Sequence, residues 1–311
     1  MHSDLIDLGW TEEQWNRITS VVTEEAQKAR VAAQLIPVVG PEASTTVAVA
    51  PLSLENRFNP YPYPDRNQPE PPPPPPLQAG HRLRVESRPT LDITTIAVNV
   101  PLRGHEVADL ELQAALVMFR RAANYIARIE DALVFAGRAG ANQAPLGIGA
   151  IPDVYTVTGD GAPSGIFLGP LAGARITPPY PSAPSPPTSG AQVVEQVIAA
   201  ISRLEGAGQL GPYACALSQR LFELICTPTA SMVLPRDRIL PFLQGPLFRS
   251  SRIPSPFGAV IALSGNPIEL DVATDINVRF VQTTLEPRWV FRVSERVALR
   301  VKEAQAIAIL G

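Results

Sequence analysis

The sequence is poor in the residues that carry redox and acid–base chemistry. It has two cysteines, Cys215 and Cys226, whose spacing fits neither a zinc site nor a Cys-x-x-Cys redox motif, and it has three histidines. No stretch reaches the roughly 20 apolar residues that a membrane helix requires. The N-terminus lacks the basic start and the apolar run of a secretory signal. We therefore expect a soluble, cytoplasmic protein without a disulfide framework and without a membrane partner.

The sequence also lacks a large excess of either positive or negative charge. The formal net charge is −3, which gives no basic footprint for nucleic acid, so no nucleic-acid partner is expected. Hydrophobic residues make up 45% and charged residues 18% of the 311 residues, a balance that excludes a disordered chain and allows a sizeable core.

Proline, in contrast, is abundant. Sixteen of the 34 prolines lie in two loops, residues 59–76 and 178–187. The first loop ends in six consecutive prolines at 71–76, which favour an extended polyproline conformation. We interpret it as a stiff exposed loop tip, with docking of a proline-binding partner as the alternative.

A search for catalytic motifs finds none. The histidines are His2, His81 and His105, and we interpret them as solvated or capping residues. The glycines around Ser164 do not have the spacing of a nucleophile elbow. Residues 147–152 begin like a dinucleotide fingerprint, but Pro152 occupies the third glycine position. We therefore expect no catalytic residue, no metal and no cofactor, and a protein that is not an enzyme.

Hydrophobic periodicity predicts a helix near the N-terminus and a long hairpin after it. The run Thr11-Glu12-Glu13-Gln14 is a capping box, and an apolar stripe follows as far as Ala33 before Pro37 stops the helix. Two expected strands, 45–54 and 82–100, surround the first Pro-rich loop and form an extended hairpin.

A second, longer helix is expected over residues 106–136. Its apolar stripe includes Leu116 and Phe119, Gly137 is suited to cap its C-terminus, and its length would be roughly 45 Å. Such a length predicts a spine for the fold. Adjacent side chains on a helix point about 100° apart, so Glu130-Asp131 is interpreted as a surface or interface salt-bridge pair.

The remaining part of the chain is predicted to be richer in strands. A helix is expected at 191–204, strands at 214–217, 257–263, 267–272, 291–301 and 306–310, and a helical segment at 218–226. A modest basic cluster, Arg236, Arg238, Arg249 and Arg252, predicts inter-subunit ion pairs or a pore lining, with a binding patch as the alternative. A projecting hairpin has little core of its own and is stable when it packs on a neighbouring subunit, so these features favour an assembly protein.

The order of these parts resembles the encapsulins, bacterial and archaeal nanocompartment shell proteins with the HK97 phage capsid fold. The resemblance is carried by the helix with Trp15 that closes at Val39-Gly40-Pro41, by IARIEDALVFAG at 126–137, by Gly211-Pro212-Tyr213, by VRFVQTTLE at 278–286, and by residues 291–293 and 303–310.

The resemblance implies an α+β, HK97-like fold with a long spine helix, an extended E-loop hairpin and a β-rich axial domain. It implies a peripheral domain of residues 1–46, 99–208 and 279–311, an E-loop of residues 47–98 with the Pro-rich tip, and an axial domain of residues 209–278.

The resemblance also implies a function. Shell subunits of this family self-assemble into an icosahedral nanocompartment, which implies a homo-oligomer, most simply of 60 copies (T=1). The shell would encapsulate cargo enzymes of the peroxidase or ferritin-like iron-storage type, bound through a C-terminal targeting peptide of the cargo. A phage or prophage major capsid protein with the same fold is the alternative.

Two sites follow from the resemblance. Cargo peptide would bind the inner face near Ala29, Ala33, Leu35 and Pro37, where this chain is apolar. A fivefold pore loop would contain Thr227, Pro228, Thr229, Ala230 and Ser231.

Overall fold

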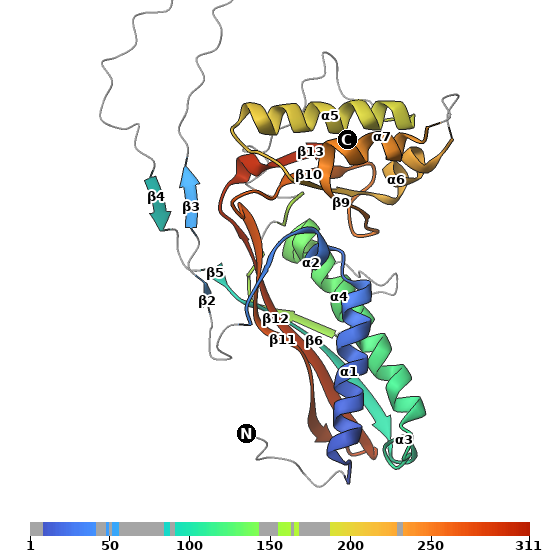
Figure 1. Cartoon of the computed structure of the whole chain (residues 1–311). Helices are drawn as coiled ribbons and strands as arrows, with labels where there is room; N and C mark the ends of the chain where they lie inside the picture. The colour runs from blue at the N-terminus through green and yellow to red at the C-terminus, as the bar shows by residue number, and fades with distance from the viewer. Residues whose placement is uncertain are drawn as a thin grey trace, which may run out of the picture.

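The computed structural model describes residues 9–41, 48–49, 52–55, 84–87, 91–142, 155–162, 165–167, 187–228 and 233–311. In this part of the chain, two sheets with their helices form two units stacked along the long direction of the molecule (Figure 1). The long strands β11 (Ile268–Thr283) and β12 (Arg288–Val301) form the middle of the first unit.

The first unit is a five-stranded sheet with the order β1-β11-β12-β6-β7. Its other strands are β1 (Val38–Val39), β6 (Thr94–Arg103) and β7 (Tyr155–Thr158). Strand β1 pairs with β11 in parallel, and the other neighbours are antiparallel. Helices α1 (Glu12–Ala29) and α4 (Gln113–Asn142) pack on each other and on the sheet.

The predicted capping box of α1 is confirmed. The Thr11 hydroxyl accepts from the Gln14 backbone, and the Gln14 side chain accepts from the Thr11 backbone. The expectation of one helix through Ala33 is wrong, because α1 ends at Ala29 and a short α2 (Ala32–Leu35) follows. Asp131 causes this break, since its carboxylate accepts from the Val31 and Ala32 backbone N–H groups at the start of α2.

The expected spine helix is also divided. A short α3 (Gly104–Val107) is separated from α4 by a turn in which Asp109 accepts from the Gln113 backbone. Gly137 has φ 68°, which interrupts α4 as expected of a C-terminal cap, although helical residues continue to Asn142. The uninterrupted part of α4 is therefore about 36 Å long, and not roughly 45 Å.

The second unit is a four-stranded sheet with the order β13-β10-β8-β9. The strands are β8 (Tyr213–Leu217), β9 (Gln244–Arg249), β10 (Gly258–Ala262) and β13 (Ile307–Leu310), with a 3₁₀ turn, η2 (Ala304–Ala306), before β13. One face packs against α5 (Gly190–Gly206), α6 (Gln219–Cys226) and α7 (Pro235–Leu243). The opposite face, with Ala216 and Ile261, joins the core of the first unit.

Most expected elements of this region are present. The helix expected at 191–204 is α5, and the strands expected at 214–217, 257–263 and 306–310 correspond to β8, β10 and β13. Helix α7 and strands β1, β7 and β9 were not expected from the sequence.

The sheets do not follow the domain ranges expected from the sequence. Helix α5 and strand β13, expected in the peripheral part, pack with the four-stranded sheet. Strand β11, expected mainly in the axial part, pairs with β12 in the five-stranded sheet.

The expected hairpin is present in its described parts. Strand β2 (Ala48–Val49) pairs antiparallel with β5 (Leu91–Asp92), and β3 (Leu52–Glu55) pairs antiparallel with β4 (Arg84–Ser87). Figure 1 shows this hairpin projecting beside the two units. Both Pro-rich loops, apart from Pro187, lie outside the described residues.

Candidate functional site

The residues expected at a cargo-binding surface lie at the junction between α1, α2 and β1. Ala29 ends α1, Ala33 lies in α2, and both are half-buried, as is Pro37 directly before β1. Leu35 is different, because its side chain is 1% exposed and belongs to the main core. A peptide on this surface would therefore contact Ala33 and Pro37, whereas Leu35 would act as a support from below.

Strand β1 continues this surface with two exposed apolar side chains. Val38 is 48% and Val39 38% exposed, although both belong to a sheet. The strand is held at the sheet edge by its parallel pairing with β11 and by the bond from the Leu270 backbone to the Pro37 carbonyl, 2.9 Å. An edge strand with outward valines offers both backbone hydrogen bonds and apolar area to an extended peptide.

The expected pore loop lies between α6 and α7. Thr227 follows α6 and is exposed, and its hydroxyl donates to the Glu223 carbonyl over 2.8 Å. Pro228 is also exposed, while Thr229, Ala230 and Ser231 lie outside the described residues. The placement of this loop at a fivefold opening stays a prediction.

A buried charge cluster holds the end of α1 against α4, β11 and β12. The Arg30 guanidinium lies 2.8 Å from the Glu130 carboxylate and 3.6 Å from the Asp275 carboxylate, and it donates to Glu295. The side chains of Glu130 and Glu295 are each 1% exposed. One guanidinium therefore faces two buried carboxylates, and the expectation that Glu130 lies in a surface or interface ion pair is wrong.

Burial sets the protonation of this cluster. It raises the pKa of Glu130 to about 7, although Arg30 opposes the shift. Burial also raises the pKa of Glu295, and the nearby Glu130 carboxylate adds to that effect. Burial by itself would lower the pKa of Arg30, but Glu130, Glu295 and Asp275 together raise it. The arginine stays charged, and the two glutamates hold a proton to higher pH than free carboxylates do.

Asp131 points away from Glu130, as expected for adjacent helical residues, but it is also buried. Its carboxylate caps α2 by accepting from the Val31 and Ala32 N–H groups, 3.0 and 2.8 Å away. Burial raises the pKa of Asp131 to about 7 against the effect of these donors. Glu130 thus holds the end of α1 through Arg30, and Asp131 holds the start of α2.

A second charge cluster lies where β11 and β12 approach the four-stranded sheet. Arg300 contacts Glu269 at 2.7 Å and Asp271 at 2.8 Å, and Lys302 contacts Glu269 at 2.6 Å. Both acids are nearly inaccessible to solvent. Because these cations and anions are paired across two strands, the cluster fixes strand register and offers no vacant ligand position.

The basic residues noted in the sequence do not form one patch. Arg249 lies over the Phe222 ring of α6, 5.7 Å from its centroid, whereas Arg236 and Arg238 are exposed on α7. Arg252 lies in the turn after β9, where burial and the nearby Arg128 lower its pKa. Whether any of them lines a pore stays a prediction.

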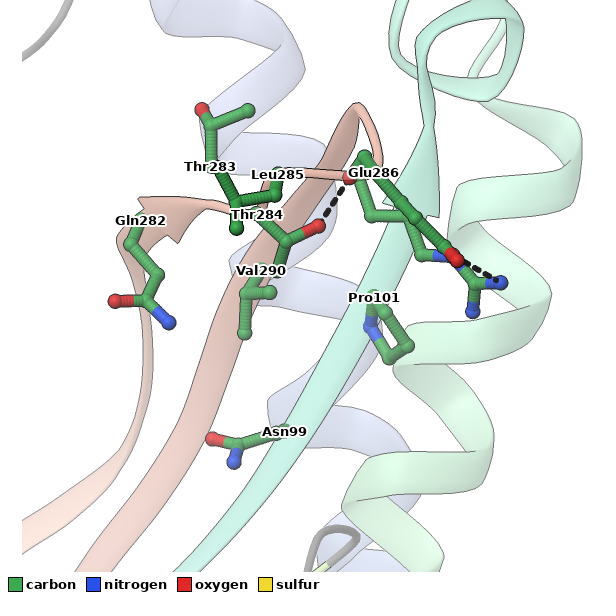
Figure 2. Close-up of a pocket in the computed structure, with 9 residues that line it drawn as sticks. Asn99, Pro101, Gln282, Thr283, Thr284, Leu285, Glu286 and Val290 are labelled. Carbon is green, nitrogen blue, oxygen red and sulfur yellow. Dashed lines mark hydrogen bonds and ion pairs between the residues drawn. The ribbon is translucent and has the colours of Figure 1, made fainter.

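The five-stranded sheet ends in a hollow of about 850 Å³ beside the β11–β12 turn. Val290 on β12 and Pro101 on β6 lie side by side below the turn residues Thr284 to Glu286, and Asn99 lies farther along β6 (Figure 2). The Thr284 hydroxyl donates to the Glu286 carbonyl, and Arg288 lies 3.3 Å from the Glu286 carboxylate. These groups stabilise a turn, and they include no nucleophile next to a base.

The described residues contain no grouping that suggests catalysis. No three His, Cys, Asp or Glu side chains among them are placed to hold a metal ion. His105 is exposed on α3, while His2, His81, Ser164 and residues 147–152 lie outside the described part of the chain. Among the described helices, none has the length and apolar character needed to cross a membrane.

Comparisons with known proteins agree on the fold. The virus-like particle from Pyrococcus furiosus matches with a TM-score of 0.62 at 13% identity, over 97% of this chain and 100% of that chain. The capsid of Myoviridae phage XM1 matches with a TM-score of 0.53 at 13% identity, over 90% of each chain. The SrpI encapsulin of Synechococcus elongatus PCC 7942 matches with a TM-score of 0.51 at 11% identity, over 89% of this chain and 85% of that chain.

Sequence comparison gives a more specific result. Residues 172–298 match the family model described as "Encapsulating protein for peroxidase". No curated protein matches the sequence. The α+β, HK97-like capsid fold is confirmed, and residues 172–298, less than half of the chain, are similar to the peroxidase-encapsulating family.

Proposed function

We propose that this chain is a structural shell subunit that self-assembles into an icosahedral nanocompartment around a cargo enzyme. The observation that carries the proposal is the match of residues 172–298 to a peroxidase-encapsulating family within a chain that has the capsid fold over 97% of its length.

The simplest shell is a homo-oligomer of 60 copies (T=1) in the cytoplasm. In it, residues 47–98 act as the E-loop between neighbours, and the unit built on the four-stranded sheet gathers at the fivefold vertices, with residues 227–231 at the opening. The cargo is an enzyme of the peroxidase class, for which the matched family is named, or of the ferritin-like iron-storage class.

The cargo docks through a C-terminal targeting peptide on the surface formed by Ala29, Ala33 and Pro37. The exposed Val38 and Val39 support this proposal, because an apolar edge strand beside half-buried small residues suits an extended apolar peptide. Leu35 supports the surface from inside the core.

The experiment that tests shell formation is electron microscopy of the chain expressed alone and separated by size. Uniform hollow particles support the proposal, and a small oligomer overturns it. The likeness to the phage XM1 capsid supports the alternative of a phage major capsid protein. Particles that contain nucleic acid, or that form only with a scaffolding protein, would favour that alternative.

Cargo docking is tested separately by co-expression with a fluorescent protein that carries the C-terminal peptide of a candidate peroxidase. The variant Ala33→Asp places a charge on the proposed surface and should abolish loading while shells persist. The matched control Gln34→Asp changes an exposed neighbour in the same short helix. Equal loading of both variants would contradict this site.

A further inference from the structure

One face of the five-stranded sheet carries arginines and is turned away from the core. Phe291 and Val293 on β12 are buried against α1 and α4, so the alternating Arg292 points to the opposite face. The same alternation places Arg279 of β11 and Arg103 of β6 on this face. The helices α1, α3 and α4 contribute to the core on the other side.

The arginines face one another in register. Arg279 is directly opposite Arg292 across β11 and β12, and Arg288 is directly opposite Arg103 across β12 and β6. Like charges in directly opposed positions destabilise an antiparallel pair. The separate chain therefore bears an electrostatic penalty at this face, and an anionic partner would remove it.

Carboxylates of the described residues pair with at most one of the four arginines on this face. Arg103, Arg279 and Arg292 form no ion pair within the part of the chain that the structure describes. Arg288 contacts Glu286 at 3.3 Å, but with side chains 47% and 81% exposed this pair is weak. The nearby Asp275 is directed to Arg30.

The same end of the molecule presents an acidic surface on its helical side. Glu12 and Glu13 are exposed in the first turn of α1, and Glu111 is exposed before α4. Glu13 and Glu111 line a shallow hollow of about 520 Å³ together with Leu110, which is 83% exposed. Arg17 is the cation of this hollow, 3.5 Å from Glu111, and both side chains are largely exposed.

We propose that the arginine face, defined by Arg103, Arg279, Arg288 and Arg292, binds the acidic end, defined by Glu12, Glu13 and Glu111, of a second copy of this chain. The contact joins two different surfaces and is therefore heterologous, so that repeated contacts close a ring when the rotation permits. Charge complementarity within one sequence favours this occupant, because each copy brings both partners. The inference rests on the proposed shell function and specifies one of its contacts.

The test reverses the charges of each side and then of both. Arg279→Glu with Arg292→Glu should raise the protein concentration needed for assembly about tenfold or more at low salt, as should Glu12→Arg with Glu13→Arg. All four changes in one chain should restore assembly toward that of the unmodified protein. Added salt should weaken assembly of the unmodified chain, since exposed charges are screened over about 10 Å at 0.1 M. Particle mass is followed by sedimentation velocity.

The variant Arg292→Gln distinguishes an interface from a merely structural role. It should stabilise the dissociated subunit toward urea, because it removes the repulsion from Arg279, while weakening assembly. If Arg292 had only a structural role, this substitution would instead lower both the stability of the subunit toward urea and its assembly.

The outcomes distinguish a failure of the proposed shell function from a failure of the proposed contact between copies. If the unmodified chain forms no particles, the proposed function fails and this inference falls with it. If the unmodified chain forms particles and the reversed-charge variants assemble equally well, the inference alone is wrong. If the arginine variants assemble normally but lose co-purified nucleic acid, the face binds nucleic acid and the second-copy proposal is overturned.

Discussion

Replacing Arg30 with methionine should expose how strongly the buried charge cluster depends on its one cation. Arg30 joins the end of α1 to Glu130 on α4 and to Glu295 on β12, and both carboxylates are almost inaccessible to water. Removing one partner of a buried ion pair leaves an uncompensated charge and costs about 3–5 kcal/mol. That loss is a large fraction of the roughly 5–15 kcal/mol by which a domain is stable.

The cost should depend on pH. Because burial raises the pKa of Glu130 to about 7, the folded chain binds more protons than the unfolded chain between about pH 4.5 and 7. Stability linked to Glu130 is therefore fully present below the unfolded pKa and is lost as pH rises toward 7. Without Arg30 the carboxylates ionise with still more difficulty, so the destabilisation by Arg30→Met should be small near pH 5 and full near pH 8.

Urea unfolding of the dissociated subunit, followed by circular dichroism at pH 5 and pH 8, measures this difference. Leu35→Ala is the matched control, since it removes buried apolar volume without changing charge, and its effect should not depend on pH. Adding Glu130→Gln and Glu295→Gln to Arg30→Met should recover most of the stability at pH 8. Equal losses for Arg30→Met at both pH values would refute the electrostatic explanation.

Three further changes test other parts of the fold by the same unfolding measurement. Leu35→Ala should cost about 2–5 kcal/mol because Leu35 is a core residue, and a cost near zero would contradict its burial. Asp131→Asn should cost about 1 kcal/mol, since the charged acceptor of two α2 N–H groups is lost; an unchanged midpoint would show that the cap is dispensable. Gly165→Ala should cost about 1–3 kcal/mol because a Cβ there would lie 2.3 Å from the Gly137 nitrogen, whereas Gly104→Ala, with no atom within 4 Å, should be tolerated.

The sequence predicts the regular elements well where local signals decide them. The capping residue Thr11 marks the start of α1, and Gly137 marks the interruption of α4. These features depend on residues three or four positions apart, or on one residue that tolerates positive φ, so they are visible without tertiary information.

Features that depend on distant partners could not be predicted in the same way. The division between α1 and α2 arises from Asp131, which is 100 positions away from Val31 in the sequence. Glu130 looked like a surface residue because its partners, Arg30 and Glu295, come from two other elements. Strand β1 is only two residues long and is defined by its pairing with β11, which no local pattern indicates.

The candidate sites show the same limit. The expected cargo surface consisted of Ala29, Ala33, Leu35 and Pro37. In the structure Leu35 is buried in the core, whereas Ala29, Ala33 and Pro37 are half-buried. Part of the arginine face can be inferred from the sequence, because Arg292 and Arg296 alternate with apolar residues in β12 and so indicate one polar face of this strand. Its significance emerges only when β11 places Arg279 opposite Arg292.

The two-sided burial of the four-stranded sheet has a mechanical consequence. Ala216 and Ile261 pack into the main core, while Cys215 and Val260 on the same strands pack beneath α5, α6 and α7. A hinge between the two units would separate close-packed side chains along this sheet, so bending within a subunit is costly. The curvature of any assembly built from this chain must therefore be adjusted at the joints between copies, with each subunit acting as a stiff plate.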